Sequence, residues 1–232
     1  MRRALRALSS VLIVTGALLV IDAVLTVVWQ EPVTAIYAKV HQNELGGDLK
    51  KLDRAPVTPS DARVLRLLHA DSERIAFLAR SLRRHAHDGQ ALGRIRIPHI
   101  HASYVMVEGT DGASLRKGPG HYPDTPLPGM PGTVGVAGHR TTYLAPFNKL
   151  DKLRKGDEVQ LQMPYALVTY RVEQTRIVPP TAVWVTRRVG YDRLVMTACH
   201  PKYSAAKRIV VFARQVSETP RGASAQLSAR SQ

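Results

Sequence analysis

Cysteine is almost absent from this 232-residue chain, which has Cys199 and no other. A lone cysteine excludes an internal disulfide, and its thiol is then either a small buried apolar group or a reactive site. Aromatic residues make up only 6%, fewer than proteins that stack many nucleic-acid bases usually carry. The formal net charge is +15, but no run of five or six like charges and no nucleic-acid motif occurs. The charge therefore predicts a solvated basic surface and a polyanionic neighbour such as anionic lipid or wall polymer, without a nucleic-acid partner.

Apolar residues fill one long stretch near the N-terminus. Residues 11–29 read VLIVTGALLVIDAVLTVVW and hold a single charge, Asp22. At about 1.5 Å per residue, a helix over this stretch spans roughly 28 Å, close to the apolar core of a bilayer. Three arginines precede it, so the positive-inside rule places residues 1–10 in the cytoplasm. No small-x-small cleavage site follows, and we expect an uncleaved, single-pass signal-anchor in the cell membrane with the rest of the chain outside the cell.

Residues 30–91 are predicted to form a helical stalk between the membrane segment and a folded domain. Apolar residues continue at helical spacing, and we expect Gly46 and Gly47 to end the first stalk helix. A second, amphipathic helix is expected over 60–87, with Ser60 as its N-cap. Such a stalk would hold the domain off the membrane, or it would dock on the domain or on a partner.

The residue composition and pattern of the sequence change after the stalk. Short runs rich in β-branched residues, separated by glycine and proline, predict an all-β sandwich or barrel over residues 92–216. The segment 217–232 is rich in serine, alanine and arginine and is expected to be disordered. The expected strands are 94–97, 103–107, 133–138, 158–162, 167–178, 193–198 and 208–214.

Three polar residues stand at the ends of predicted strands. His139 follows one apolar strand, Cys199 ends another, and Arg208 opens the last. Such residues can meet at one end of a barrel, where an imidazole takes a thiol proton and a guanidinium stabilises the oxyanion of acyl transfer. The spacing alone does not force this arrangement, because cysteine, histidine and arginine occur together in most chains by chance. A zinc site formed by Cys199 and His200 with His139 and His121 lacks the paired spacing of zinc ligands, so we expect no metal.

Two longer segments carry a family resemblance. LPGMPGTVGVAGHRTTYLAPFNKLDKLRKGDEV (127–159) and LVMTACHPKYSAAKRIVVFAR (194–214) resemble bacterial sortases, and most nearly the actinobacterial class E type. The resemblance covers roughly residues 93–216, with several motifs in the family's order. It implies an eight-stranded sortase-type β-barrel with short helices, working without a cofactor.

The resemblance also implies a reaction. Cys199, His139 and Arg208 fall on the family's catalytic residues of a cysteine transpeptidase. Cys199 would attack the Thr–Gly bond of a C-terminal sorting signal, LAxTG- or LPxTG-like, and form a thioacyl enzyme. His139 would protonate the departing glycine amine and later accept a proton from an amine of a peptidoglycan precursor. The implied partners are the sorting-signal-bearing surface proteins that become anchored to the wall, the precursor, and the membrane.

Four residues are substrate-binding candidates, three of them by the same resemblance. The family's TLxTC box falls on residues 195–199, where Thr197 keeps the usual residue. Ala198 replaces a threonine that commonly lines the substrate or oxyanion site, so a hydroxyl contact is lost. Tyr122, in the loop before the histidine strand, is either the tyrosine that the family links to a preference for LAxTG or an ordinary loop aromatic. Trp184, between two late strands, either walls the substrate groove or packs in the core.

Neighbours of the catalytic residues and two other functions complete the hypotheses. Arg140 adjoins His139 and could orient it, and His200 either tunes the field at Cys199 or is solvated. An L,D-transpeptidase is one alternative function, although such enzymes carry an SHGC-type motif where this chain reads TACH. A catalytically inactive, membrane-held barrel that serves as a binding module is the other.

Overall fold

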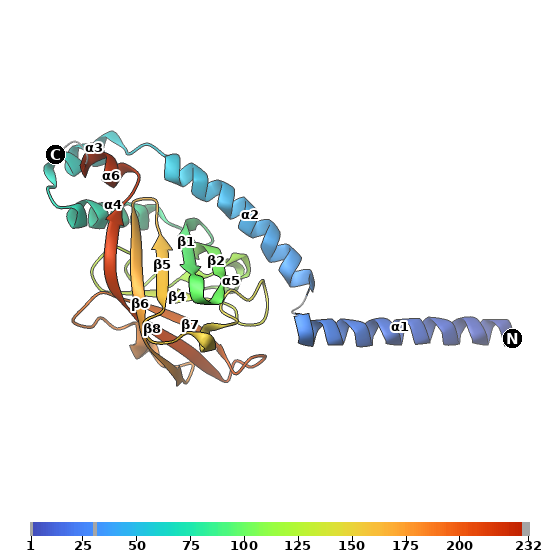
Figure 1. Cartoon of the computed structure of the whole chain (residues 1–232). Helices are drawn as coiled ribbons and strands as arrows, with labels where there is room; N and C mark the ends of the chain where they lie inside the picture. Colours follow the sequence, from blue (N-terminus) through green and yellow to red (C-terminus); the bar gives the residue numbers. More distant parts are fainter. Residues whose placement is uncertain (1, 30–31, 229–232) are drawn as a thin grey trace.

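A closed barrel of eight strands forms the body of the protein, and an N-terminal helix stands apart from it (Figure 1). This computed structural model describes residues 2–29 and 32–228, with side chains for 5–24 and 34–225. The predicted eight-stranded barrel is confirmed. Its strands are β1 (Ala91–Ile97), β2 (Ala102–Glu108), β3 (Gly120–His121), β4 (Thr133–Ala137), β5 (Glu158–Gln162), β6 (Ala166–Val178), β7 (Arg193–His200) and β8 (Lys207–Pro220).

The strand order around the barrel is β1-β2-β3-β4-β7-β8-β6-β5. Most neighbours are antiparallel, but β4 runs parallel to β7, and β2 runs parallel to β3. Parallel neighbours need a long connection. The connection from β4 to β7 contains β5, β6 and two short 3-10 helices, η2 (Leu150–Lys152) and η3 (Val183–Thr186). Two strands distant in sequence therefore lie side by side.

Side-chain alternation separates the interior of the barrel from its outer surface. Along β7, Leu194, Met196 and Ala198 belong to the main core cluster inside the barrel. Val195 belongs to a second cluster with Val210 and other residues of β6, β8 and η3. Because successive side chains of a strand point to opposite faces, the odd-numbered residues of β7 face outward. This second cluster covers part of that outer face.

Within the described residues, six α-helices accompany the barrel. The long helix α1 contains residues 5–24 with a mean hydropathy of 2.2 and no burial inside the protein, which is long and apolar enough to cross a membrane. The predicted apolar segment is thus helical, as expected of an anchor or a signal sequence. The helices are α1 (Arg2–Trp29), α2 (Pro32–Arg54), α3 (Pro59–Leu67), α4 (Asp71–His85), α5 (Gly112–Lys117) and α6 (Ala223–Ser228).

The helix α2 does not end at Gly46 and Gly47, so that prediction is wrong. It continues to Arg54. Leu45 and Leu49 are buried in a cluster with apolar residues of β1 and β2. Each interior glycine destabilises a helix by about 1 kcal/mol relative to alanine, while fully burying a leucine side chain gains about 1.5–3 kcal/mol. Packing against the barrel thus outweighs the local preference.

The side chain of Gln42 also fixes α2 to the barrel. Its amide nitrogen donates to the carbonyl oxygens of Val105, at 2.9 Å, and Lys117, at 2.8 Å. Its amide oxygen accepts from the backbone N–H of Val105 at 2.7 Å. These bonds satisfy groups at the part of β2 that β3 leaves unpaired. Docking on the domain, one of the roles left open for the stalk, is the arrangement that the structure shows.

The second stalk helix is in fact two helices, α3 and α4, with a break at residues 68–70. The N-cap of α3 is Thr58, not Ser60, because the Thr58 hydroxyl accepts from the backbone N–H of Asp61 at 3.1 Å. In α4, Ile75 and Ala79 are fully buried in the main core. The segment before residue 92 therefore contributes to the folded domain.

The C-terminal segment is more ordered than predicted. The strand β8 extends to Pro220, and α6 follows it, whereas disorder was expected from residue 217. The Ser224 side chain is fully buried and its hydroxyl donates to the carbonyl oxygens of Tyr165 and Arg221. This buried hydroxyl holds the segment on the loop between β5 and β6. Residues 229–232 of the predicted tail lie outside the described residues.

Candidate active site

Three neighbouring strands bring the predicted catalytic residues to one end of the barrel. Cys199 in β7 is the direct antiparallel partner of Arg208 in β8. His139 follows β4 by two residues, and β4 is the parallel neighbour of β7, with Ala137 opposite Thr197. The N–H of Gly138 continues this pairing by donating to the carbonyl oxygen of Thr197 at 3.0 Å. If this register is extended by two residues, His139 falls opposite Cys199, so the strand pairing favours a site that contains all three residues.

Cys199 and Arg208 also share the outer face of the barrel. Along β7, Val195, Thr197 and Cys199 are two residues apart, so they lie on the same face of the strand. Arg208, Val210 and Phe212 have the same spacing along β8. Because Val195, Val210 and Phe212 lie in the outer cluster, alternation directs Cys199 and Arg208 outward as well. Cys199 is partly exposed and has no disulfide. A thiol on this face is open to a substrate.

A cavity of about 270 Å³ lies on this face, next to the candidate catalytic residues. Thr197 and Arg208 belong to its lining, and Tyr122 lines it from the segment between β3 and β4. The rest of the lining comes from the β6–β7 connection with η3 and from neighbouring residues: Asp124, Thr125, Val178, Pro179, Pro180, Ala182, Val183, Val185, Thr186 and Val210. Mostly apolar walls with a few polar groups are typical of a ligand-binding groove.

Two contacts fix Tyr122 in this groove. Its hydroxyl is hydrogen-bonded to the Thr197 hydroxyl at 2.8 Å. Its ring lies against Gly135 of β4, where an added Cβ would be only 2.7 Å from the Tyr122 Cδ2 atom. Glycine at this position therefore makes room for the ring. Of the four substrate-binding candidates, Tyr122 and Thr197 are the two whose side chains the structure brings together.

The other two candidates lie elsewhere. The Ala198 side chain is buried in the main core inside the barrel, so it does not line the groove, and a hydroxyl at this position would also point inward. Trp184 in η3 is 39% exposed and stacks on Phe212 of the outer cluster, with ring centroids 6.2 Å apart. Its neighbours Val183 and Val185 line the groove, but Trp184 itself does not.

The environment of His139 favours a neutral imidazole. Burial lowers the pKa of His139 below its ordinary 6.5, and the positive charge of Arg116 lowers it further. Its Nε2 atom is buried and has no hydrogen-bond partner among the described residues. The ring of Tyr143 lies 5.1 Å away, between centroids. A neutral ring with a free nitrogen is suited to accept a proton.

Arg140 joins the segment that carries His139 to the end of β7. The side chain is buried, at 4% exposure, and its Nη1 atom donates to Nδ1 of His200 at 2.7 Å and to the carbonyl oxygen of Cys199 at 3.4 Å. Its Nη2 atom pairs with Asp151 at 3.0 Å. The sequence predicts Arg140 as a neighbour that could orient His139, but it does not predict the contact between Arg140 and His200. The sequence signal that points to a role for Arg140 is a charged residue close to the end of a buried strand.

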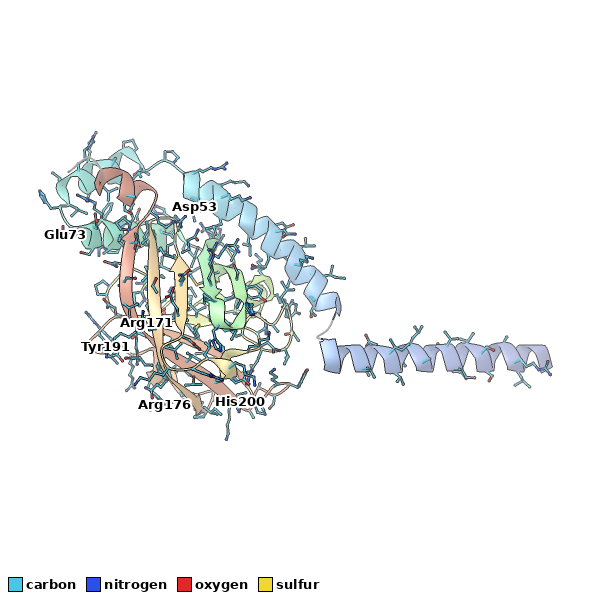
Figure 2. The ribbon with its side chains drawn as sticks, in the orientation of Figure 1. Asp53, Glu73, Arg171, Arg176, Tyr191 and His200 are labelled. Atoms are coloured by element: carbon cyan, nitrogen blue, oxygen red, sulfur yellow. The ribbon has the colours of Figure 1, made fainter. Side chains whose placement is uncertain are left out.

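A second pair of hydrogen bonds links the segment after β4 to the segment after β7. The Asn148 side chain donates to the carbonyl oxygen of Arg140 at 2.9 Å, and Lys202 donates to the amide oxygen of Asn148 at 2.9 Å. His200 lies at the end of the barrel remote from Glu73 of α4 (Figure 2). The hydrogen bonds of Arg140 and of Asn148 therefore both lie at the end of the barrel that carries the candidate catalytic residues.

His121 is placed as a structural residue. It is fully buried, and its Nδ1 atom lies 2.8 Å from the carboxylate of Glu108 and its Nε2 atom 3.1 Å from the carbonyl oxygen of Pro126. No group of three or more histidine, cysteine, aspartate or glutamate residues that could hold a metal ion was found within the described part of the chain.

Comparison with known proteins agrees with this geometry. A family model described as "Sortase domain" matches residues 95–216. Sortase D of Bacillus subtilis is 37% identical over 133 residues, which cover 55% of this chain and 65% of that protein. Sortase SrtE1 of Streptomyces coelicolor is 27% identical over 151 residues, covering 57% of this chain and 42% of that protein. The match thus spans less than two thirds of either curated relative.

Solved structures show the same barrel. The structure of sortase E from Streptomyces avermitilis is 34% identical, with a TM-score of 0.53, and the match covers 58% of this chain and 93% of that one. A sortase E1 structure from Streptomyces coelicolor, described with a tripeptide in its active site, is 26% identical with a TM-score of 0.55, covering 57% of this chain and 91% of that one.

Proposed function

The chain belongs to the sortase family, and from that premise we propose that it is a cysteine transpeptidase with Cys199 as nucleophile, His139 as acid and base, and Arg208 as the oxyanion group. Sortases as a family are transpeptidases that act on sorting-signal-bearing proteins and on cell-wall precursors. The observation that supports the proposal for this chain is the strand pairing: Cys199 is opposite Arg208, and β4, which His139 follows by two residues, is the neighbour of β7. Arg208 also lines the groove.

The proposed reaction has two halves. The Cys199 sulfur attacks the carbonyl carbon of the Thr–Gly bond as His139 takes the thiol proton, and collapse of the tetrahedral intermediate passes that proton to the departing glycine amine. A thioester on Cys199 remains. In the second half, an acceptor amine attacks the thioester, His139 takes the amine proton, and the thiolate leaves and regains a proton. Arg208 stabilises the negative oxygen in both intermediates.

The acceptor we propose is an amine of a peptidoglycan precursor, and the product is a surface protein anchored to the wall. The apolar helix α1, which carries three arginines in its first turns, supports a single-pass anchor that keeps the N-terminus in the cytoplasm and the barrel outside. Protease treatment of intact cells, with immunodetection of the barrel, tests this orientation. Protection of the barrel in intact cells would refute it.

The groove supports a sorting signal that has a small residue at its second position. The Tyr122 ring, fixed by Thr197 and by the absence of a side chain at Gly135, occupies space on the groove wall. We propose that this wall selects LAxTG-like over LPxTG-like signals, because a small side chain leaves more room beside the ring.

Mass spectrometry tests the chemistry. The full chain in detergent is mixed with LAxTG- or LPxTG-type peptides, and an amine is then added. We expect a thioester on Cys199, its transfer to the amine, and faster acylation by the LAxTG peptide. The Cys199→Ala variant is the control and should form no adduct. Peptide exchange that persists in that variant would reject the proposal.

A further inference from the structure

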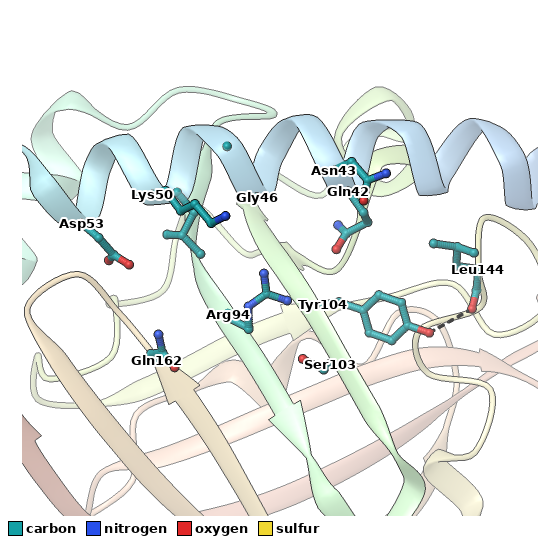
Figure 3. Close-up of a pocket in the computed structure, with 12 residues that line it drawn as sticks. Gln42, Asn43, Gly46, Lys50, Asp53, Arg94, Ser103, Tyr104, Leu144 and Gln162 are labelled. Atoms are coloured by element: carbon teal, nitrogen blue, oxygen red, sulfur yellow. Dashed lines mark hydrogen bonds between the residues drawn. The ribbon is translucent and has the colours of Figure 1, made fainter.

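A second cavity, of about 640 Å³, lies between α2 and the barrel strands β1 and β2 (Figure 3). Its upper wall is one stripe of α2, formed by Asn43, Gly46, Lys50 and Asp53 at helical spacing. Gly47 also belongs to the lining. This stripe runs beside the buried residues that dock α2 on the barrel, so it faces the cavity and not the core.

The two glycines have no structural reason to be glycine. Neither has a positive φ, and a Cβ added at either position would meet no atom within 4 Å. Glycine inside a helix is destabilising relative to alanine. The helix therefore carries two unfavourable residues at a place where side chains fit without strain. What the glycines do provide is an open cavity and close access to the helix surface.

The charges around the cavity are not paired with each other. Arg94 points from β1 toward α2, between Lys50 and Tyr104, while Asp53 lies at one end (Figure 3). Among the described residues, neither Arg94 nor Lys50 makes a hydrogen bond or an ion pair, and the Oδ1 atom of Asp53 is buried without a hydrogen-bond partner. The pKa of Arg94 is lowered by burial and by the positive charge of Arg96, with Asp53 opposing the shift.

The loop after His139 borders the same cavity. Leu144 is part of the lining, and its carbonyl oxygen accepts from the Tyr104 hydroxyl at 3.3 Å. Tyr143, Leu144 and Ala145 all have a positive φ, of 50°, 63° and 40°. Three such residues in succession are a strained arrangement, and strain of this kind gathers at functional segments. The Tyr143 ring contacts the ring of His139.

We propose that this cavity binds a short acidic peptide that carries a free amino group. Two cations, Arg94 and Lys50, match two carboxylates, and the Asp53 carboxylate matches an ammonium. Gly46 lets the ligand backbone approach the helix. A ligand in this place also packs against Leu144, so its binding reduces the motion of the strained loop. Because the Tyr143 ring contacts the His139 ring, the motion of His139 is reduced as well. The site is separate from the groove beside Cys199.

The dipeptide Ala-Glu has this charge pattern and serves as the probe. Its affinity for the full chain in detergent micelles is measured by saturation-transfer NMR. We expect saturable binding that weakens at least tenfold in Arg94→Gln and is lost in Gly46→Leu, while the melting temperature of Gly46→Leu does not fall. N-acetyl-Ala-Glu, which lacks the ammonium, should bind more weakly than Ala-Glu, and Asp53→Asn should remove that difference.

The matched control is Arg96→Gln, which removes an exposed cation two residues along β1 and outside the cavity lining. It should leave the affinity unchanged. Hydrogen–deuterium exchange gives a readout that is independent of activity: Ala-Glu should slow exchange in residues 139–150 of the native chain and not in Gly46→Leu. Absence of saturable binding, unchanged binding in Gly46→Leu, or equal weakening by the Arg94 and Arg96 variants would each overturn the proposal.

Discussion

Replacing Arg140 by methionine should reduce both stability and turnover, and the two effects can be measured separately. The change removes a buried guanidinium that holds the Cys199 carbonyl oxygen, the His200 ring and the Asp151 carboxylate. Breaking a buried ion pair costs about 3–5 kcal/mol. The Asp151 side chain is 37% exposed, so water replaces part of the lost contact, and we expect a loss of about 2–3 kcal/mol in unfolding free energy.

The pH dependence of this loss has a defined sign. Burial raises the pKa of Asp151, but the hydrogen bond and charge of Arg140, together with a backbone hydrogen bond and the charge of Lys202, hold that pKa below its ordinary 3.8. A carboxyl group with a depressed pKa stabilises the fold above its unfolded pKa and loses this effect as the pH falls through the folded value. The stability difference between the native chain and Arg140→Met should therefore be full at neutral pH and should shrink below about pH 4.

Turnover should fall because Arg140 fixes the two catalytic segments relative to each other. A misplacement of about 1 Å can reduce a rate about 100-fold, so we expect kcat to fall by 10- to 100-fold with little change in KM. Arg140→Lys keeps the charge but offers a single donor group in place of a planar fork, and it should recover only part of the rate.

Chemical denaturation and peptide-cleavage kinetics check these values. The matched control is Arg214→Met, which removes an exposed arginine paired with Glu173 at 2.9 Å. An exposed pair contributes about 0–1 kcal/mol, so this variant should keep nearly all stability and the full rate. A normal kcat in Arg140→Met, measured where the variant is folded, would refute a positioning role and leave Arg140 with a purely structural one.

Three further predictions concern the groove, the base and the docked helix. Tyr122→Phe removes the hydrogen bond to Thr197, and the ratio of LAxTG to LPxTG turnover should fall; an unchanged ratio in competition assays would rule out a selective role for the hydroxyl. Arg116→Gln removes a charge that lowers the pKa of His139, so the acidic limb of the pH–rate profile should move to higher pH, and a shift in the opposite direction would contradict the assigned cause. Gln42→Ala leaves polar groups of β2 without partners and should cost about 2–3 kcal/mol in urea denaturation, whereas an undiminished stability would mean that α2 is not docked in solution.

Local properties of the sequence were sufficient for some features. A helix over residues 11–29 follows from an apolar run of bilayer length, and the strands follow from short β-branched runs between turn residues. The placement of His139 and Cys199 at strand ends is also readable in the sequence, because a change from apolar to polar residues marks where a strand leaves the core. These features depend on neighbours along the chain.

Other features were decided by contacts between distant residues. The pairing of β4 with β7 brings the strand end that His139 follows next to the strand that carries Cys199, and no local pattern specifies that register. The continuation of α2 through Gly46 depends on buried leucines that meet the barrel, and the inward direction of Ala198 depends on which face of β7 is enclosed. The bond from Arg140 to His200 joins residues 60 positions apart. Local preferences are worth about 1 kcal/mol per residue, whereas burial of one large side chain can exceed that value, so tertiary packing decided each of these cases.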